Sequence, residues 1–208
     1  GRRPSARRVE TLGRWWGLPV WHLEDGFLRS VDKGPDHPPL ALLVDDLGVH
    51  FDATAPSRLE QLIAEPLTPR QIERARQVQS LWCEQRLSKL NPHRDSPVPD
   101  ESFVLVVDQS AGDCSIALGL AGGDHFRWML KAALEENPDS TVVVRVHPDV
   151  IRGQSRGHFQ ATELQHPRIR ISADGLHPAG LLERASAVYV VTSQMGFEAL
   201  LWGRPVHC

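Results

Sequence analysis

Continuous apolar runs alternate with amphipathic segments over the second half of the chain, and this alternation predicts a parallel sheet. Strands of parallel sheets are covered on both faces, so they read as unbroken runs of Val, Ile and Leu. Buried strands are predicted at 103–107, 141–146, 168–171 and 188–191, and helices at 126–136, 178–185 and 194–202. Successive strand and helix units of this kind imply right-handed crossovers.

The first half of the chain has a less regular pattern, in which short apolar runs stand between turn sequences. A helix is predicted from Ser5 to about Trp16, followed by a short strand over residues 18–23. Residues 40–45 and 49–51 are predicted to form a hairpin, because the Asp-Leu-Gly sequence between them is typical of a turn.

Two further helices are predicted before the middle of the chain. The first begins after Ser57, which together with Glu60 has the spacing of a capping box. The second begins near Thr68, with Pro69 at its first position, and runs to about Leu90. Its apolar positions repeat along one face, so we expect a long amphipathic helix that can cross between two lobes.

Residues 91–102 read as a linker, because they hold three prolines and several charges without apolar periodicity. We therefore place a domain boundary there and expect one lobe over residues 1–95 and a second over residues 96–208. The chain begins with Gly1 and ends with Cys208 inside a predicted strand, so we expect a fragment of a longer polypeptide.

The composition fits a globular protein and excludes several classes. The 208 residues are 41% hydrophobic and 24% charged, and the net charge of -3 gives no general attraction to nucleic acid. The three cysteines stand far apart without metal-ligand spacing, which disfavours disulfide scaffolds and zinc sites and fits a reducing cytoplasm. No apolar run approaches the ~18 residues that a membrane-spanning helix needs.

Two adjacent carboxylates, Glu24 and Asp25, stand at the end of a predicted strand and precede Gly26. A turn of this kind carries its side chains into the cleft above a sheet, although Asp-Gly turns without any chemistry are common. The Phe-Leu-Arg-Ser sequence that follows favours a functional role. Its apolar side chains would bury the turn, while Arg29 and Ser30 offer hydrogen-bond donors beside the carboxylates.

Polar residues also follow two of the buried strands. Thr192 and Ser193 follow one strand, and His147 and Pro148 follow another. The carboxyl ends of parallel strands meet at one edge of a sheet, and a helix N-terminus attracts anions, so phosphate is the expected ligand. Ser193 could instead only cap the next helix, and a lone histidine is more often structural. Glu198, one turn into that helix, could bind ribose hydroxyls or stand on the helix surface.

Familiar nucleotide-binding and hydrolase motifs are absent from the sequence. Without a GxGxxG, a P-loop or a GxSxG motif, dinucleotide enzymes, P-loop NTPases and serine hydrolases are disfavoured. Metal ligation by His147, His158 and His166 is conceivable, but none of them has a partner at helical spacing, so no metal site is predicted.

Five segments together resemble the capsule polysaccharide biosynthesis family. They are EDGFLRS at 24–30, DATAPSRLE at 52–60, VLVVDQSAGDCSI at 104–116, ENPDSTVVVRVHPDV at 136–150 and VYVVTSQMGFEALLWGRPVHC at 188–208. Within the family they look most similar to the amino-terminal glycosyltransferase module of the KpsC-type β-Kdo transferases. The resemblance implies an α/β, GT-B-like fold of two Rossmann-type lobes with parallel sheets. Residues 1–95 would be the acceptor-side lobe with the catalytic turn, and 96–208 the donor-binding lobe.

The same resemblance implies a retaining transfer of Kdo from CMP-Kdo to a glycolipid acceptor, which places a β-Kdo linker on lysophosphatidylglycerol. Asp25 would be the nucleophile, and Glu24 the second carboxylate of the catalytic motif. No metal and no cofactor besides the donor substrate is expected. The residues expected to bind the donor are Gln109, Ser115, His147, Pro148, Thr192, Ser193 and Glu198.

The resemblance also implies a cytoplasmic protein in peripheral contact with the inner membrane face and the capsule export machinery, without a nucleic-acid partner. Relatives often carry lysine before the His-Pro pair, whereas this chain has Arg145 and Val146, which leaves charge near the phosphate but changes its reach. Two alternatives stay open. One is a GT-B enzyme that uses another nucleotide sugar, such as a UDP-sugar. The other is a non-catalytic nucleotide-binding module of the capsule assembly machinery, with Asp25 only a turn residue.

Overall fold

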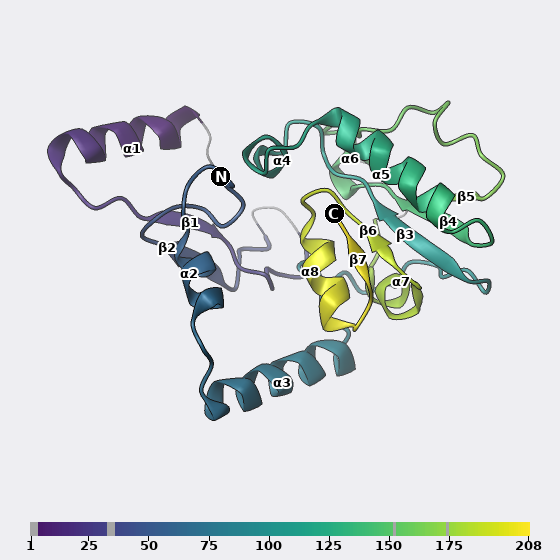
Figure 1. Cartoon of the computed structure of the whole chain (residues 1–208), viewed down its shortest axis with the longest axis horizontal. Helices are drawn as coiled ribbons and strands as arrows, with labels where there is room; N and C mark the ends of the chain where they lie inside the picture. The colour runs from purple at the N-terminus through teal and green to yellow at the C-terminus, as the bar shows by residue number, and fades with distance from the viewer. Residues whose placement is uncertain (1–3, 33–35, 152, 174) are drawn as a thin grey trace.

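A five-stranded parallel sheet forms the centre of the second half of the chain (Figure 1). The computed structural model describes residues 4–32, 36–151, 153–173 and 175–208. The strands lie in the order β5-β4-β3-β6-β7. The chain therefore adds β4 and β5 on one side of β3, and then β6 and β7 on its other side. They are β3 (Phe103–Val107), β4 (Thr141–Arg145), β5 (Ile169–Ser172), β6 (Val188–Tyr189) and β7 (Val206–His207). This confirms the predicted parallel sheet. The strand order reverses between β3 and β6, and open α/β sheets bind ligands at such a point.

Helices cover both faces of this sheet. In Figure 1, α5 (Gly123–Glu136) lies on one face, and α7 (Ala179–Arg184) and α8 (Gln194–Leu201) lie on the other. The short helices α4 (Cys114–Leu118) and α6 (Pro148–Ile151) follow the carboxyl ends of β3 and β4. Neither of these two short helices was predicted from the sequence.

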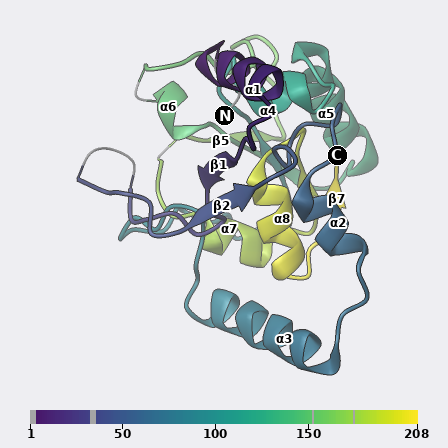
Figure 2. The same ribbon diagram turned by 90° about the vertical axis from the view of Figure 1, so that its left-hand side faces the viewer.

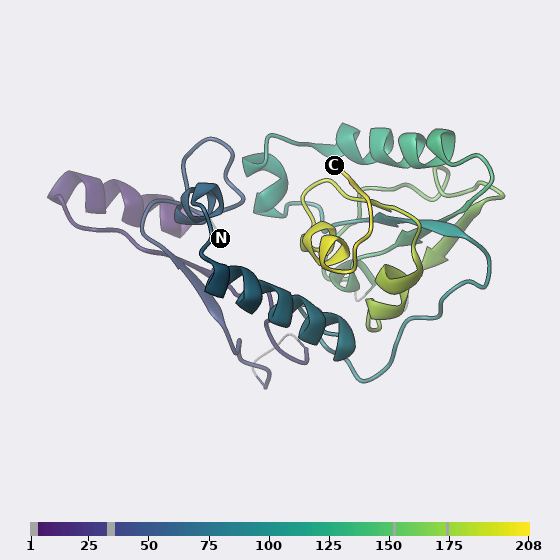
Figure 3. The same cartoon turned by 60° about the horizontal axis from the view of Figure 1, so that its bottom comes forward.

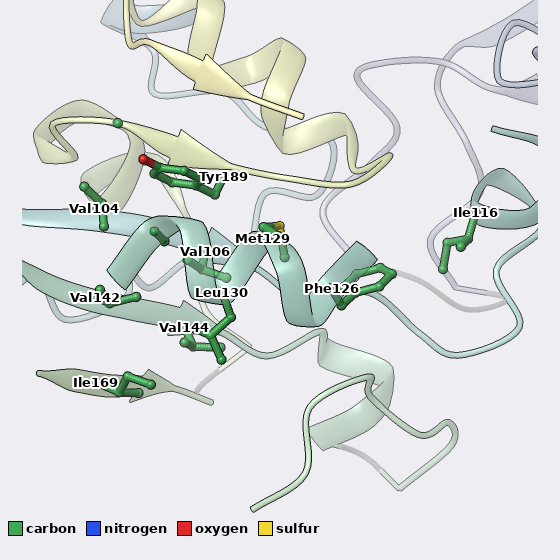
Figure 4. Packing of buried hydrophobic residues seen from close by; sticks show 12 residues of the cluster. Val104, Val106, Ile116, Phe126, Met129, Leu130, Val142, Val144, Ile169 and Tyr189 are labelled. Atoms are coloured by element: carbon green, nitrogen blue, oxygen red, sulfur yellow. The ribbon is translucent and has the colours of Figure 1, made fainter. Parts of the chain in front are cut away.

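Alternate residues of β3 enter two separate cores, one on each face of the sheet. Val104 and Val106 pack with Phe126 and Leu130 of α5, as Figure 4 shows. Leu105, which points the other way, packs with residues of α7 in the second core. Burial of each such side chain contributes about 1.5–3 kcal/mol, so the two cores hold the carboxyl ends of β3 and β4 in a fixed position.

Over its described residues, the first half of the chain forms a two-stranded antiparallel sheet with three helices. Its elements are α1 (Pro4–Trp16), β1 (His22–Asp25), β2 (Leu42–Asp45), α2 (Arg58–Ala64) and α3 (Pro69–Glu84). Figures 1 and 3 place α1 far from the parallel sheet, and Figure 2 shows α3 below β1 and β2. The end of α3 reaches α8, where the Gln79 side chain donates to the Leu201 carbonyl at 2.9 Å.

Several predictions for the first half are confirmed and others are wrong. The capping box of Ser57 and Glu60 is present at the start of α2. The prediction of a hairpin is wrong, because residues 42–45 pair with β1 and not with 49–51. The prediction of a second Rossmann-type lobe with its own parallel sheet is also wrong for the described residues, since the sheet of the first half is antiparallel. The helix predicted to run to Leu90 ends at Glu84.

Candidate functional site

A cavity of about 900 Å³ lies between the two halves of the chain, at the carboxyl ends of the parallel strands. Residues that follow β3, β4 and β6 form one wall, and the end of β1 with the segment after α3 forms the other. The first half contributes Glu24, Asp25, Phe27, Ser88 and Lys89 among others, and the second half contributes Gln109, Ser115, His147, Thr192, Ser193 and Glu198 among others. The acidic turn and the predicted phosphate site therefore share one cavity.

Glu24 and Asp25 are the last two residues of β1, and do not lie beyond the strand as predicted. The acidic turn, residues 24–30, is held by an ion pair and by a close backbone approach. Arg29 Nε donates to Asp25 Oδ2 at 2.7 Å, and the Asp25 side chain is 37% exposed. The same guanidinium donates to the carbonyl oxygen of Asp32 at 3.0 Å, so its position is fixed by the following loop. A Cβ atom on Gly26 would lie 2.7 Å from Ala41 Cβ, which explains the glycine. The result is an oriented carboxylate that faces the cavity.

His147 lies close after the end of β4, and contacts at Nδ1 orient its ring. The backbone N–H of Asp149 donates to His147 Nδ1 at 3.1 Å, and Ser110 Oγ lies 3.1 Å from the same nitrogen. A ring nitrogen that accepts from a backbone N–H carries no hydrogen, so the neutral ring has its hydrogen on Nε2. The histidine can therefore donate from Nε2 to an anionic oxygen.

Thr192 follows β6 and is fixed by the loop after β3. Gln109 Nε2 donates to Thr192 Oγ1 at 3.0 Å, while the Thr192 backbone N–H donates to Gln109 Oε1 at 3.0 Å. Ser115 Oγ lies 3.1 Å from the same threonine hydroxyl. Gln109 is buried and follows β3, while Thr192 follows β6, so this bridge lies where the strand order reverses. Gln109 and Ser115, which were predicted to contact the donor, both hold Thr192 in place.

Ser193 caps α8, as the structural alternative for this residue predicted. Its Oγ accepts from the backbone N–H of Met195 at 3.3 Å, and its backbone is extended, as in an N-cap. Capping does not exclude anion binding, because the first N–H groups of a helix point outward along its axis. The cap fixes the end of α8 at the cavity wall.

Glu198 lies one turn into α8 and is 1% exposed. Its Oε1 accepts from the backbone N–H of Lys89 at 3.2 Å and from Gln194 Nε2 at 3.1 Å. Burial raises the pKa of Glu198 to about 7, although hydrogen bonds from Ser88, Lys89 and Gln194 oppose this rise. The carboxylate therefore joins α8 to the first half of the chain, and neither alternative from the sequence, a ribose ligand or a solvent-facing side chain, anticipated this contact.

Two residues of the cavity wall that hold neighbouring segments in place, Asp108 and Gln194, were not among the predicted site residues. Asp108 directly follows β3 and is buried, and its Oδ1 accepts from the backbone N–H groups of Gln109 at 2.8 Å and His158 at 3.1 Å. Burial raises the pKa of Asp108 and these two N–H donors lower it, with a net rise. Its place at a strand end could have identified it. Gln194, which joins α8 to the acidic turn, had no such sequence signal.

Every predicted site residue except Pro148 lines the cavity. Pro148 begins α6, and its side chain lies outside the described part of the chain. Arg145 is buried, and its guanidinium donates to Ser96 Oγ at 2.8 Å and to the Leu176 carbonyl. The positive charge of Arg145 is therefore bonded to Ser96, in the segment between α3 and β3.

The described residues contain no group of three or more His, Cys, Asp and Glu side chains placed to hold a metal ion. In the same part of the chain, no helix combines the length and the apolar character needed to span a membrane.

Comparison with known proteins decides the family. The family described as "Capsule polysaccharide biosynthesis protein" matches residues 1–96 and 73–208, which together cover the whole chain. The chain belongs to this family. The capsule polysaccharide modification protein LipA of Neisseria meningitidis serogroup A is 40% identical over 218 residues, which cover 99% of this chain and 30% of LipA.

Two solved structures extend the family match to three dimensions. The β-Kdo 2,4 transferase of Thermosulfurimonas dismutans KpsC superposes with a TM-score of 0.90 at 40% identity, over 99% of this chain and 66% of that chain. The β-Kdo 2,7 transferase of the same KpsC gives a TM-score of 0.67 at 28% identity, over 96% of this chain and 67% of that chain. This member of the capsule family is thus a close structural match to part of a KpsC β-Kdo transferase module, and it spans less than a third of the length of LipA.

Proposed function

We propose that this chain transfers Kdo from CMP-Kdo to a glycolipid acceptor during the biosynthesis of capsular polysaccharide. The observation that carries the proposal is the single cavity that holds both the Asp25 turn and the residues after β3, β4 and β6. The similarity to the β-Kdo 2,4 transferase of KpsC supports Kdo as the sugar. The β-Kdo linker on lysophosphatidylglycerol belongs to this proposal as the expected product.

The donor phosphate is proposed to bind between His147 and the N-terminus of α8. His147 carries a hydrogen on Nε2 that can reach an anionic oxygen, and the helix end adds unpaired N–H groups and a partial positive charge. Thr192 completes the proposed phosphate site, and its hydroxyl is held by Gln109 and Ser115. These donors stabilise the negative charge that develops on CMP as it leaves, which is how preorganised donors accelerate group transfer.

Asp25 is proposed as the nucleophile. Its carboxylate attacks the anomeric carbon of Kdo, and the bonding electron pair leaves with the phosphate oxygen of CMP. An acceptor hydroxyl then attacks the same carbon and displaces Asp25, while Glu24 takes the hydroxyl proton. Two displacements at one carbon retain the configuration. Arg29 keeps the Asp25 carboxylate oriented for the first of them.

The two halves of the chain are proposed to act as the two sides of a GT-B-like cleft, with residues 1–95 on the acceptor side and 96–208 on the donor side. The position of the cavity between the two halves supports this division. Peripheral contact with the inner membrane face is also proposed, because the acceptor is a lipid. Exposed tryptophans at the end of α1, Trp15 and Trp16, are side chains of the kind enriched at membrane interfaces.

Incubation of the protein with CMP-Kdo and a synthetic glycolipid acceptor tests the proposal. Mass spectrometry should show the addition of one Kdo residue, and NMR of the product should show the β configuration. Transfer from UDP-sugars without transfer from CMP-Kdo would replace this function by that of another nucleotide-sugar enzyme. Binding of CMP without any transfer would support the non-catalytic module.

A further inference from the structure

The Gln194 side chain joins the start of α8 to the turn that carries Asp25. Its Nε2 donates to the Phe27 carbonyl oxygen at 2.6 Å and to Glu198 Oε1 at 3.1 Å. Phe27 lies two residues after Asp25, and Gln194 directly follows the cap of α8. One side chain therefore connects the proposed nucleophile with the proposed phosphate site.

The chemistry of this contact requires a group that donates two hydrogen bonds, which the amide of Gln194 does. Both partners of Gln194 are hydrogen-bond acceptors, one a carbonyl and the other a carboxylate, so the bridging group needs two hydrogens on one atom. A glutamate here would place a carboxylate against two acceptors. An asparagine would hold the same amide one methylene short. Methionine would keep the approximate length and remove both donors.

The bridge is part of a closed circuit of hydrogen bonds. Lys89 donates its backbone N–H to Glu198 Oε1 at 3.2 Å, and its carbonyl oxygen accepts from the Arg29 backbone N–H at 2.9 Å. Arg29 belongs to the same turn as Phe27 and holds Asp25 through its Nε. The circuit thus returns to the acidic turn from which it starts. Because Glu198 is buried, the two bonds that it accepts are shielded from water, which strengthens them.

We propose that Gln194 is a positioning residue for sugar transfer, which holds the Asp25 turn at a fixed distance from the phosphate site at the N-terminus of α8. The proposal rests on the function proposed above. A nucleophile must lie close to the carbon that it attacks, and a displacement of about 1 Å can cost a hundredfold in rate. Gln194 acts through the backbone of Phe27, and it does not itself need to touch the donor.

A matched pair of variants tests this role. Gln194→Met removes the bridge at the start of α8. Gln79→Met removes a glutamine-to-carbonyl bond between the first half and the end of α8, at Leu201 and away from the acidic turn. We expect Gln194→Met to lower kcat for transfer from CMP-Kdo by about 10- to 100-fold, with the Kd for CMP changed by less than about twofold. Gln79→Met should leave both quantities near the wild-type values.

Hydrogen exchange measures the position of the turn independently of transfer. Amides of residues 26–30 should exchange faster in Gln194→Met and at the wild-type rate in Gln79→Met. Wild-type kcat and unchanged exchange in Gln194→Met would overturn the proposal. If the wild-type protein transfers no Kdo, the proposed function fails, while the exchange data still decide whether Gln194 positions the turn. Should Gln194→Met fail to fold, Gln194→Asn carries the same test.

Discussion

Replacing Glu198 by glutamine should stabilise the protein at neutral and alkaline pH. Glu198 is 1% exposed, and burial raises its pKa from 4.5 to about 7 against the hydrogen bonds that hold it. Glutamine has the same shape and keeps a carbonyl oxygen that can accept from the Lys89 N–H and from Gln194. The substitution therefore removes the ionisable carboxyl group and retains an oxygen that accepts these hydrogen bonds.

The sign and size of the effect follow from the two pKa values. Between about pH 4.5 and pH 7 the native state keeps a proton that the unfolded chain has lost, so the free energy of unfolding falls as the pH rises. One pKa unit corresponds to about 1.4 kcal/mol, so the loss grows to about 3 kcal/mol above pH 7. Below about pH 4.5 Glu198 is protonated in both states, and its ionisation contributes nothing.

Urea unfolding of the wild type and of Glu198→Gln between about pH 4 and pH 8 measures this difference. The curves for the free energy of unfolding should separate with increasing pH, with the variant more stable by about 3 kcal/mol at the alkaline end. The control is Glu135→Gln on the exposed side of α5, which should change stability by less than about 0.5 kcal/mol at every pH. A difference that does not depend on pH, or a variant that is less stable above pH 7, would refute the reasoning.

Three further outcomes are expected. His147→Ala should weaken CMP binding by about 1–3 kcal/mol, the range for a lost charge-assisted hydrogen bond, and an unchanged Kd in a calorimetric titration would count against the phosphate site. Gly26→Ala should destabilise the protein by about 1–3 kcal/mol, because its Cβ would lie 2.7 Å from Ala41 Cβ, and Ala41→Gly in the same chain should restore part of the loss in urea unfolding. CMP should raise the melting temperature more than UDP does, and the reverse order would favour a UDP-sugar enzyme.

The parallel sheet could be predicted because its strands are unbroken apolar runs. β3 was predicted at its observed bounds, Phe103–Val107, and every residue of this strand is buried. β6 is shorter than predicted, since the ladder includes only Val188 and Tyr189. Prediction succeeded where burial on both faces leaves a continuous pattern.

The end of α3 had no sequence signal. The apolar pattern continues through Leu87, but the helix stops at Glu84 and the chain reverses at Arg86, whose φ is 52°. Glycine usually occupies this left-handed position, so an arginine there does not mark a helix end. The Leu87 N–H donates to the Trp82 carbonyl oxygen at 2.8 Å, and this contact closes the turn.

The hairpin prediction failed because of the bonding of Asp45. Its Oδ1 accepts from the backbone N–H groups of Leu47 and Gly48 at 2.8 and 3.0 Å, and its Oδ2 accepts from the Arg58 N–H at 2.8 Å. These bonds direct the chain toward α2 and leave β2 to pair with β1. A side chain that bonds to a residue 13 positions away leaves no local pattern.

Several predicted site residues, among them His147 and Thr192, follow strand ends, and their convergence on one cavity follows from the parallel sheet. What could not be predicted is how the two halves meet. The bonds of Gln194 to Phe27 and of Glu198 to Lys89 join residues far apart in sequence, and neither residue type carries a pattern that indicates such a contact.

The central claim is that Asp25 attacks the sugar of a donor whose phosphate binds at His147 and the N-terminus of α8, across the same cavity. Its most direct test is the rate of Kdo transfer from CMP-Kdo by Asp25→Asn, together with the Kd for CMP. The account predicts a fall in kcat of at least about a thousandfold, as for other lost nucleophiles, with a Kd for CMP within about twofold of the wild type. Wild-type transfer by this variant would contradict it.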